Sequence, residues 1–144
     1  MSRYTGASPR VKAIVDRRAA GRCEKCGKAT ASQLHHRRPR GMGGTRREST
    51  NEASALLALC EPCHRFIETA ARDLSRSNGW LVRQNSDPLT MPVLYRGRRA
   101  WLDDAGQVDY CTHLTRMMLH DNVYGDYEQC ADCDHQFTTD GGPI

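Results

Sequence analysis

The chain has 144 residues, of which 38% are hydrophobic and 6% aromatic, and its formal net charge is +4. This length suits one domain, or a small domain with an appendage, and the modest apolar content limits the core that folding can bury. No apolar run approaches the roughly 20 residues of a membrane helix, and the N-terminus lacks the apolar segment of a signal peptide. We therefore expect a cytoplasmic protein that does not enter a membrane. Its seven cysteines then favour metal binding over a disulfide framework.

The charges are distributed unevenly along the chain. Residues 1–47 carry 13 Lys or Arg and two acidic residues, whereas residues 102–144 carry one Arg and nine acidic residues. Many charge runs are solvated surfaces. Here several arginines lie beside a histidine pair in a glycine-rich segment, which favours contact with a phosphate backbone. The acidic end is suited to a protein partner instead.

The first expected element is a helix that starts at Ser8-Pro9 as N-cap and first helical residue and stops at Gly21. Its apolar residues recur at helical spacing, and they are Val11, Ile14, Val15 and Ala19. This pattern predicts an amphipathic helix packed on the core.

The histidine pair follows in a short predicted strand over residues 33–38. A polar loop over 39–50, with glycines at 41, 43 and 44, separates it from a second short apolar strand over 53–60. Residues 61–79 then predict one helix with an apolar stripe of Ile67, Ala71 and Leu74, on which His64 also lies.

Beyond residue 80 the sequence predicts two or three strands, with a hairpin near Arg96-Gly97. Residues 112–121 predict a short helix in the acidic tail. The fold class expected from this order is α+β.

Two Cys-x-x-Cys turns lie on either side of the histidine pair. Zinc in a structural site requires four ligands in a closed tetrahedron, and each turn supplies two thiolates. Two pairs of free cysteines are the alternative, but paired turns are a specific signal for metal. We predict a structural zinc site made of Cys23, Cys26, Cys60 and Cys63.

Three histidines remain beside this site: His35, His36 and His64. Neighbouring residues of a strand point to opposite faces, so one metal ion cannot easily bind both His35 and His36. We expect His35 and His64 to bind one divalent ion and His36 to face the substrate as a base. His64 taken alone would fit a buried core histidine equally well.

A second group of cysteines and histidines lies in the acidic tail. It suggests a second zinc site formed by Cys111, His113, Cys130 and Cys133. The alternative is a buried Cys111 and a flexible last Cys-x-x-Cys turn.

The segments CEKCGK, LHHRRPRGMGG and LLALCEPCHRFIE together resemble the HNH endonucleases, whose active unit is the ββα-metal finger. The likeness is greatest to small HNH proteins of actinobacterial phages, and it covers residues 22–68 and extends to about 106. It implies a zinc-stapled ββα-metal core at 1–79 with an N-terminal helix. A β-rich extension at 80–106 would pack on this core, and an acidic tail would follow at 107–144.

The resemblance implies metal-dependent hydrolysis of DNA phosphodiester bonds in the cytoplasm of a bacterial host. His36 would deprotonate the attacking water. His35 and His64 would hold one Mg²⁺, Mn²⁺, Ni²⁺ or Zn²⁺ ion that stabilises the phosphoanion and the leaving 3′ oxygen. Arg37, Arg38 and Arg40 would clamp the neighbouring phosphates.

The chain departs from the family at Ala55, where the family has an asparagine that orients the loop carrying the base. Asn51 lies four residues earlier and is the expected replacement. The departure leaves two alternatives to an endonuclease. One is a zinc-stapled nucleic-acid-binding module without turnover, and the other is an accessory protein to a phage packaging terminase.

Overall fold

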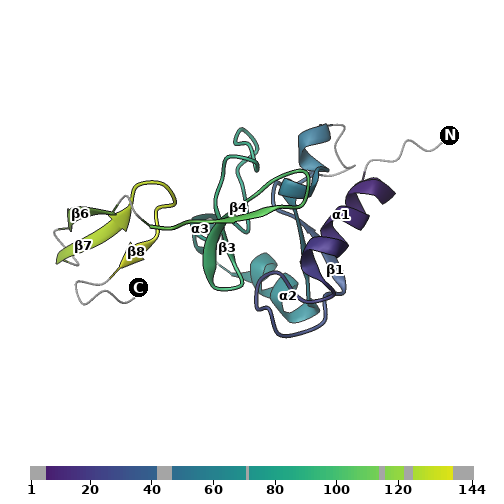
Figure 1. The fold of residues 1–144 in the computed structure, drawn as a ribbon, viewed down its shortest axis with the longest axis horizontal. Coiled ribbons are helices and arrows are strands. Elements are labelled where there is room, and N and C mark those ends of the chain that lie inside the picture. The colour runs from purple at the N-terminus through teal and green to yellow at the C-terminus, as the bar shows by residue number, and fades with distance from the viewer. Residues whose placement is uncertain (1–5, 42–46, 71, 114–115, 122–124, 138–144) are drawn as a thin grey trace. The chain divides into compact units, whose positions relative to one another are not determined.

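The computed structural model divides the chain into two compact units, Met1–Asp109 and Tyr110–Ile144, which we call unit 1 and unit 2 (Figure 1). The residues that it describes are 6–41, 47–70, 72–113, 116–121 and 125–137. The predicted loop glycines at 43 and 44 and the stripe residue Ala71 lie outside this set.

Unit 1 opens with α1 (Pro9–Ala19), which begins and ends as its sequence predicts. The Ser8 side chain accepts a hydrogen bond from the Val11 backbone N–H at 3.2 Å. The helix ends where Ala20 and then Gly21 adopt positive φ angles of 51° and 78°. Its buried residues are the four predicted from the periodicity: Val11, Ile14, Val15 and Ala19.

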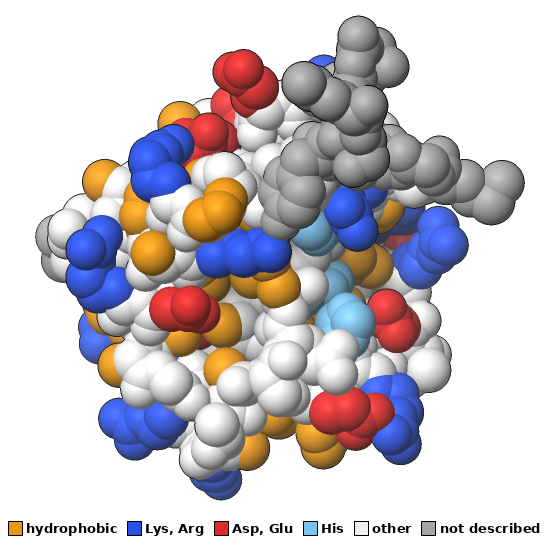
Figure 2. Space-filling model, turned by 90° about the vertical axis from the view of Figure 1, so that its right-hand side faces the viewer, with side chains coloured by type: hydrophobic (Ala, Val, Ile, Leu, Met, Phe, Trp, Pro, Cys, Tyr) orange, Lys and Arg blue, Asp and Glu red, His pale blue; other side chains and the backbone are white. Residues whose placement is uncertain are grey.

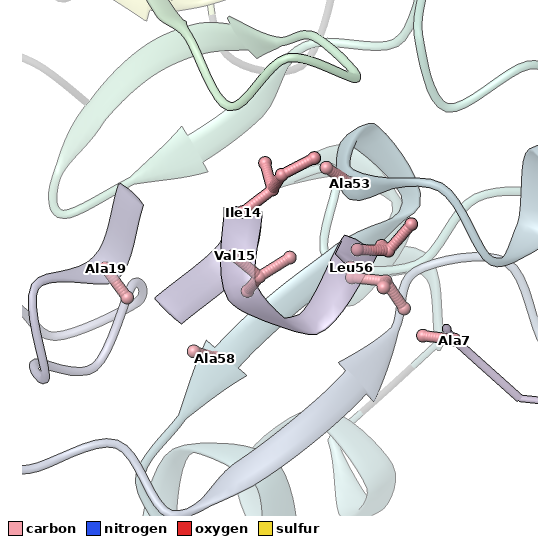
Figure 3. Close-up of a cluster of buried hydrophobic side chains, with 8 residues drawn as sticks. Ala7, Ile14, Val15, Ala19, Ala53, Leu56 and Ala58 are labelled. Atoms are coloured by element: carbon pink, nitrogen blue, oxygen red, sulfur yellow. The ribbon is translucent and has the colours of Figure 1, made fainter. Parts of the chain in front are cut away.

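These α1 residues form one side of a hydrophobic cluster. Figure 3 shows Ile14 and Val15 extending from α1 next to Ala53, Leu56 and Ala58, which come from the segment η2 (Ala53–Ala55) and from β2 (Leu56–Leu59). All four residues of β2 are buried. Since strand side chains alternate, Leu56 and Ala58 face α1, and Leu57 and Leu59 face the opposite side.

A two-stranded antiparallel sheet carries the histidine pair. β1 (Gln33–His36) pairs with β2 so that Gln33 lies opposite Leu59 and His36 opposite Leu56. The chain then continues from β2 through Cys60 into α2 (Glu61–Thr69). The local order is therefore strand, strand, helix, with α2 packed against β1.

The single helix predicted over 61–79 is wrong, because the structure has two. Ala70 adopts an extended conformation (φ −68°, ψ 160°) that ends α2, and α3 (Arg72–Ser77) follows. The buried Ser75 hydroxyl donates to the Ile67 carbonyl at 3.4 Å and ties α3 back to α2. Leu74, predicted to be inside, is 47% exposed as a result of this break.

The second sheet of unit 1 has the order β3–β4–β5. The strands β3 (Val93–Tyr95) and β4 (Arg98–Leu102) are joined by the predicted hairpin, with positive φ at both Arg96 and Gly97. The third strand is β5 (Val108–Tyr110). Gly79 ends the preceding segment at φ +72°, where a Cβ would lie 2.0 Å from the Pro92 carbonyl oxygen.

Unit 2 is a small sheet of order β6–β7–β8. The strands are β6 (Arg116–Asp121), β7 (Gly125–Cys130) and β8 (Gln136–Phe137). The helix predicted over 112–121 is therefore wrong: β6 pairs with β7 from Arg116–Cys130 to Asp121–Gly125. A short apolar run suits either helix or strand, and here the partner strand supplies the hydrogen bonds.

The protein thus combines helices and sheets, as the α+β prediction states at its coarsest level. None of the helices in the described ranges has the length and apolar character to cross a bilayer.

Candidate functional site: two cysteine clusters and a histidine-lined cavity

The first of the two cysteine clusters lies in unit 1 and contains Cys23, Cys26, Cys60 and Cys63. The four Sγ atoms all lie within 4.8 Å of one another, and Cys26 and Cys60 are 4.0 Å apart. A tetrahedral zinc ion with bonds of about 2.3 Å requires its sulfur ligands to be about 3.8 Å apart. The cluster could therefore hold zinc, as the cysteine spacing predicts.

Backbone hydrogen bonds shape the first Cys-x-x-Cys turn. The Gly27 N–H donates to the Cys23 carbonyl at 2.8 Å, and the Cys23 N–H donates to the Ala29 carbonyl at 2.8 Å. Gly27 takes up a left-handed conformation with φ +69°. The second pair of ligands is held differently, because Cys60 is the N-cap residue of α2 and Cys63 lies in its first turn.

The thiols of this cluster differ in acidity. Backbone N–H groups of Ala29 and Lys28 lower the pKa of Cys26 to about 6. Burial raises the pKa of Cys60 and of Cys63. One ligand is thus stabilised as a thiolate by the protein itself, and a bound cation would stabilise the charge of the others.

A buried carboxylate between the first two cysteines joins the cluster to the rest of unit 1. Glu24 accepts hydrogen bonds from Arg18 at 2.6 and 2.9 Å and from the Tyr95 hydroxyl at 2.9 Å. It also accepts from the Ala58 N–H at 2.7 Å. This one side chain therefore connects α1, β2 and β3, a role that the sequence analysis did not identify.

The three histidines beside this cluster come from β1 and α2. Leu34 packs against the α1 cluster, and alternation turns His35 to the α2 side, where its ring centroid lies 5.4 Å from that of His64. His36 is opposite Leu56 and faces the α1 side. In the structure His35 contacts His64 of α2, whereas His36 contacts Asn51.

His35 is buried, and its Nε2 lies 2.8 Å from the Trp80 carbonyl oxygen. Because a carbonyl only accepts, Nε2 carries the hydrogen and Nδ1 keeps a free lone pair. Burial lowers the pKa of His35 to about 4. His35 is therefore neutral at physiological pH, and the lone pair of its Nδ1 can bind a cation.

His36 is hydrogen-bonded to the asparagine that the sequence analysis singled out. Its Nε2 lies 3.0 Å from Asn51 Oδ1, across 15 residues of sequence. Burial lowers the pKa of His36, Arg40 lowers it further, and the Asn51 hydrogen bond opposes both effects. Asn51 thus contacts the histidine side chain itself.

A cavity of about 620 Å³ is bordered by all three histidines. Histidine side chains are visible in a hollow on the face drawn in Figure 2, with basic side chains around them. His36, the last residue of β1, borders this cavity together with His35. The remaining lining residues are Leu34, Pro39, Arg40, Ile67, Glu68, Arg72, Arg76, Leu81 and Val82.

His35, His64 and Glu68 come together less tightly than the cysteines. His64 Nε2 lies 3.4 Å from Glu68 Oε1, one helical turn further along α2. Within the described ranges, these three side chains do not form a group whose ligand atoms all lie within 4.8 Å of one another. His64 and Glu68 are four residues apart on a helix, and this spacing in the sequence could have identified Glu68.

The prediction that Arg37 and Arg38 clamp phosphates is wrong. Arg37 is fully buried, and its guanidinium donates to the carbonyls of Gly79, Ser54, Pro88 and Met91 at 2.8 to 3.1 Å. Arg38 is 2% exposed and donates to Thr50, Ser49 and the Ser86 carbonyl. Their N–H groups stabilise the chain around residues 49–91, so they are not available to a substrate.

Arg40, by contrast, is exposed and borders the cavity. Two arginines that the sequence analysis did not consider, Arg72 and Arg76 of α3, border it as well. Because their place depends on the break between α2 and α3, the sequence offered no clear signal for them.

The second cysteine cluster lies in unit 2 and contains Cys111, His113, Cys130 and Cys133. Its four ligand atoms all lie within 4.8 Å of one another. The predicted second set of ligands is thus brought together and could hold zinc.

Comparisons of the chain with models of protein families, with curated proteins and with solved structures found no match.

Proposed function

We propose that this protein is a metal-dependent endonuclease of the HNH class that hydrolyses phosphodiester bonds in DNA. The observation that carries the proposal is the single cavity bordered by His35, His36 and His64, in which Asn51 holds His36. The order strand, strand, helix around this cavity and the neighbouring cysteine cluster agree with the resemblance described above.

His36 is the proposed general base. When Asn51 presents its amide oxygen, Nε2 of His36 carries the hydrogen and Nδ1 is left to accept a proton. Nδ1 would take a proton from water as the water oxygen attacks phosphorus and the bond to the 3′ oxygen breaks. The imidazolium that forms keeps its hydrogen bond to Asn51, so this contact both orients the ring and supports its charge.

His35 and His64 are the proposed ligands of one divalent cation, with Glu68 as a nearby carboxylate. The neutral His35 with its free Nδ1, fixed by the Trp80 carbonyl, is suited to metal coordination. A bound cation would stabilise the negative charge that develops on the phosphoryl oxygens. Mg²⁺, Mn²⁺, Ni²⁺ and Zn²⁺ all fit a mixed imidazole and carboxylate set.

Arg40, Arg72 and Arg76 are the proposed phosphate contacts, in place of the buried Arg37 and Arg38. They border the histidine-lined cavity from two separate segments: Arg40 follows β1, and Arg72 and Arg76 belong to α3. Cations from two segments of a cavity wall can hold phosphates that flank the reacting one.

Nicking of supercoiled plasmid DNA in Mg²⁺ or Mn²⁺ tests the proposal. We expect the parent protein to nick DNA, and His36→Ala to lose at least about a hundredfold in rate because the base is removed. Asn51→Ala should lose about tenfold, since the ring remains but is no longer held.

Gln33→Ala is the matched control, because Gln33 is an exposed residue of the same strand. Zinc content, measured for every variant, verifies that the cysteine clusters are intact. Equal nicking by the parent and His36→Ala would refute the assignment of the base. DNA binding without nicking by the parent would instead favour a zinc-stapled binding module.

A further inference from the structure

Unit 2 differs from an ordinary small domain in what it buries. Among its side chains described by the structure, the buried ones are Cys111, Cys130 and Cys133. Met117, a large apolar residue of β6, is 49% exposed. The buried side chains that the structure describes in this unit are therefore all potential metal ligands.

Unit 2 is short, because it spans only Tyr110–Ile144. Chains below about 40 residues rarely bury enough apolar surface to fold, and they usually need disulfides or a metal. The Cys111 and Cys130 sulfurs lie 3.6 Å apart, far beyond the roughly 2.05 Å of a disulfide bond. A bound metal is the other cross-link that these side chains can form.

The distances in the cluster match those around a zinc ion. Tetrahedral geometry with bonds of about 2.3 Å to sulfur and about 2.0 Å to nitrogen requires about 3.8 Å between two sulfurs and about 3.5 Å between sulfur and nitrogen. The Cys111 and Cys130 sulfurs are 3.6 Å apart, and Cys133 Sγ lies 3.4 Å from His113 Nδ1. The imidazole nitrogen directed at the thiols is therefore Nδ1.

The turn that carries two of these ligands has the same construction as the first Cys-x-x-Cys turn of unit 1. The Asp134 N–H donates to the Cys130 carbonyl at 2.9 Å, just as the Gly27 N–H donates to the Cys23 carbonyl at 2.8 Å. Asp134, like Gly27, follows the second cysteine and has a positive φ, here 58°. A non-glycine residue in this conformation costs free energy, which coordination of both cysteines would offset.

His113 is held in a similar way. It has a φ of 55°, and its N–H donates to Cys111 Sγ at 3.4 Å. Its ring stacks on that of His135, with centroids 5.1 Å apart. His135 is accordingly a positioning residue for the ligand.

We propose that a Zn²⁺ ion bound by Cys111, His113, Cys130 and Cys133 is the main source of stability of unit 2, so that this unit folds only when the ion is bound. The proposal is independent of the endonuclease activity. It makes unit 2 a metal-coupled module whose structure follows zinc availability.

Zinc content and ¹H–¹⁵N NMR spectra of the full-length protein test this proposal. The parent should contain two zinc ions per chain. Cys133→Ser should contain one, and its loss of chemical-shift dispersion should be confined to residues of unit 2. The resonances of unit 1 serve as the internal reference for folding. Thr112→Ala, an exposed change between two ligands, should keep both ions and the dispersion.

Cobalt substitution gives a readout on the unmutated chain. The parent should show the summed d–d absorption of a four-sulfur site and a three-sulfur, one-nitrogen site, and Cys133→Ser should lose the second component. A parent with one zinc ion, or a Cys133→Ser protein whose unit 2 stays dispersed, would overturn the proposal. So would loss of an ion in His135→Ala but not in His113→Ala.

Discussion

The two cysteine clusters are built on similar turns but have different surroundings. Unit 1 also contains an apolar cluster and the buried carboxylate of Glu24, so its metal site is one of several sources of stability. In unit 2 the described buried side chains are the cysteines of the cluster. The same ligand chemistry can therefore reinforce a unit with an apolar cluster or, as we propose for unit 2, supply most of its stability.

This contrast predicts that changes to non-ligand side chains of unit 1 will destabilise unit 1. Comparable changes to non-ligand side chains of unit 2 should have little effect on the stability of unit 2. Chemical denaturation followed through resolved NMR resonances of each unit measures the two responses separately.

The largest such effect is expected for Glu24→Gln. It leaves Arg18, whose side chain is 1% exposed, as a buried charge without its carboxylate. Breaking a buried ion pair in this way costs about 3–5 kcal/mol in the free energy of unfolding. Glu52→Gln is the control, because its partner Arg10 is 70% exposed and the two side chains are 3.8 Å apart, so the change should cost less than about 1 kcal/mol. Equal effects of the two changes would mean that Glu24 does not hold unit 1 together.

Truncation of apolar side chains should separate the units next. Leu56→Ala removes a fully buried side chain of the unit 1 cluster and should cost about 2–5 kcal/mol. Met117→Ala removes an apolar side chain from unit 2 that is already 49% exposed, so its effect should stay within about 0.5 kcal/mol. A large loss of unit 2 stability in Met117→Ala would show that apolar packing contributes more to this unit than we propose.

The smallest expected effect concerns the DNA binding that we propose for the cavity of unit 1. Arg72→Gln combined with Arg76→Gln should leave the fold intact and reduce the slope of log affinity against log salt by about two, one for each phosphate contact. Fluorescence anisotropy with a labelled DNA duplex and the His36→Ala background measures binding without cleavage. Arg17→Gln, an exposed change on α1 away from the cavity lining, should leave the slope unchanged. An equal fall in Arg17→Gln would indicate nonspecific attraction to the basic surface.

Local patterns in the sequence predicted the local features well. Ser8, Pro9 and the apolar spacing that follows gave the start and the buried face of α1, because capping and periodicity act within a few residues. The Arg96-Gly97 hairpin follows from similar short-range chemistry. The helix predicted over 112–121 is wrong because a short apolar run is compatible with helix or strand, and here β7 provides a pairing partner for a strand.

The contact between His36 and Asn51 could be predicted only in part. The departure at Ala55 pointed to a nearby asparagine as a replacement, and Asn51 does contact the histidine. That the contact is made to the imidazole ring could not be read from the spacing, since the intervening loop determines how the two side chains meet.

The sequence by itself identified the candidate ligands of both clusters, because each Cys-x-x-Cys turn brings its own two thiols together through local geometry. Tertiary structure alone decided which arginines are buried and which border the cavity. Arg37 and Arg38 stand next to the histidines in sequence, yet carbonyls up to 54 residues away take up their N–H groups. Arg72 and Arg76 lie far from the histidine pair in sequence, yet they border its cavity. A guanidinium binds whichever acceptors the fold brings within reach, and sequence proximity to a site does not determine them.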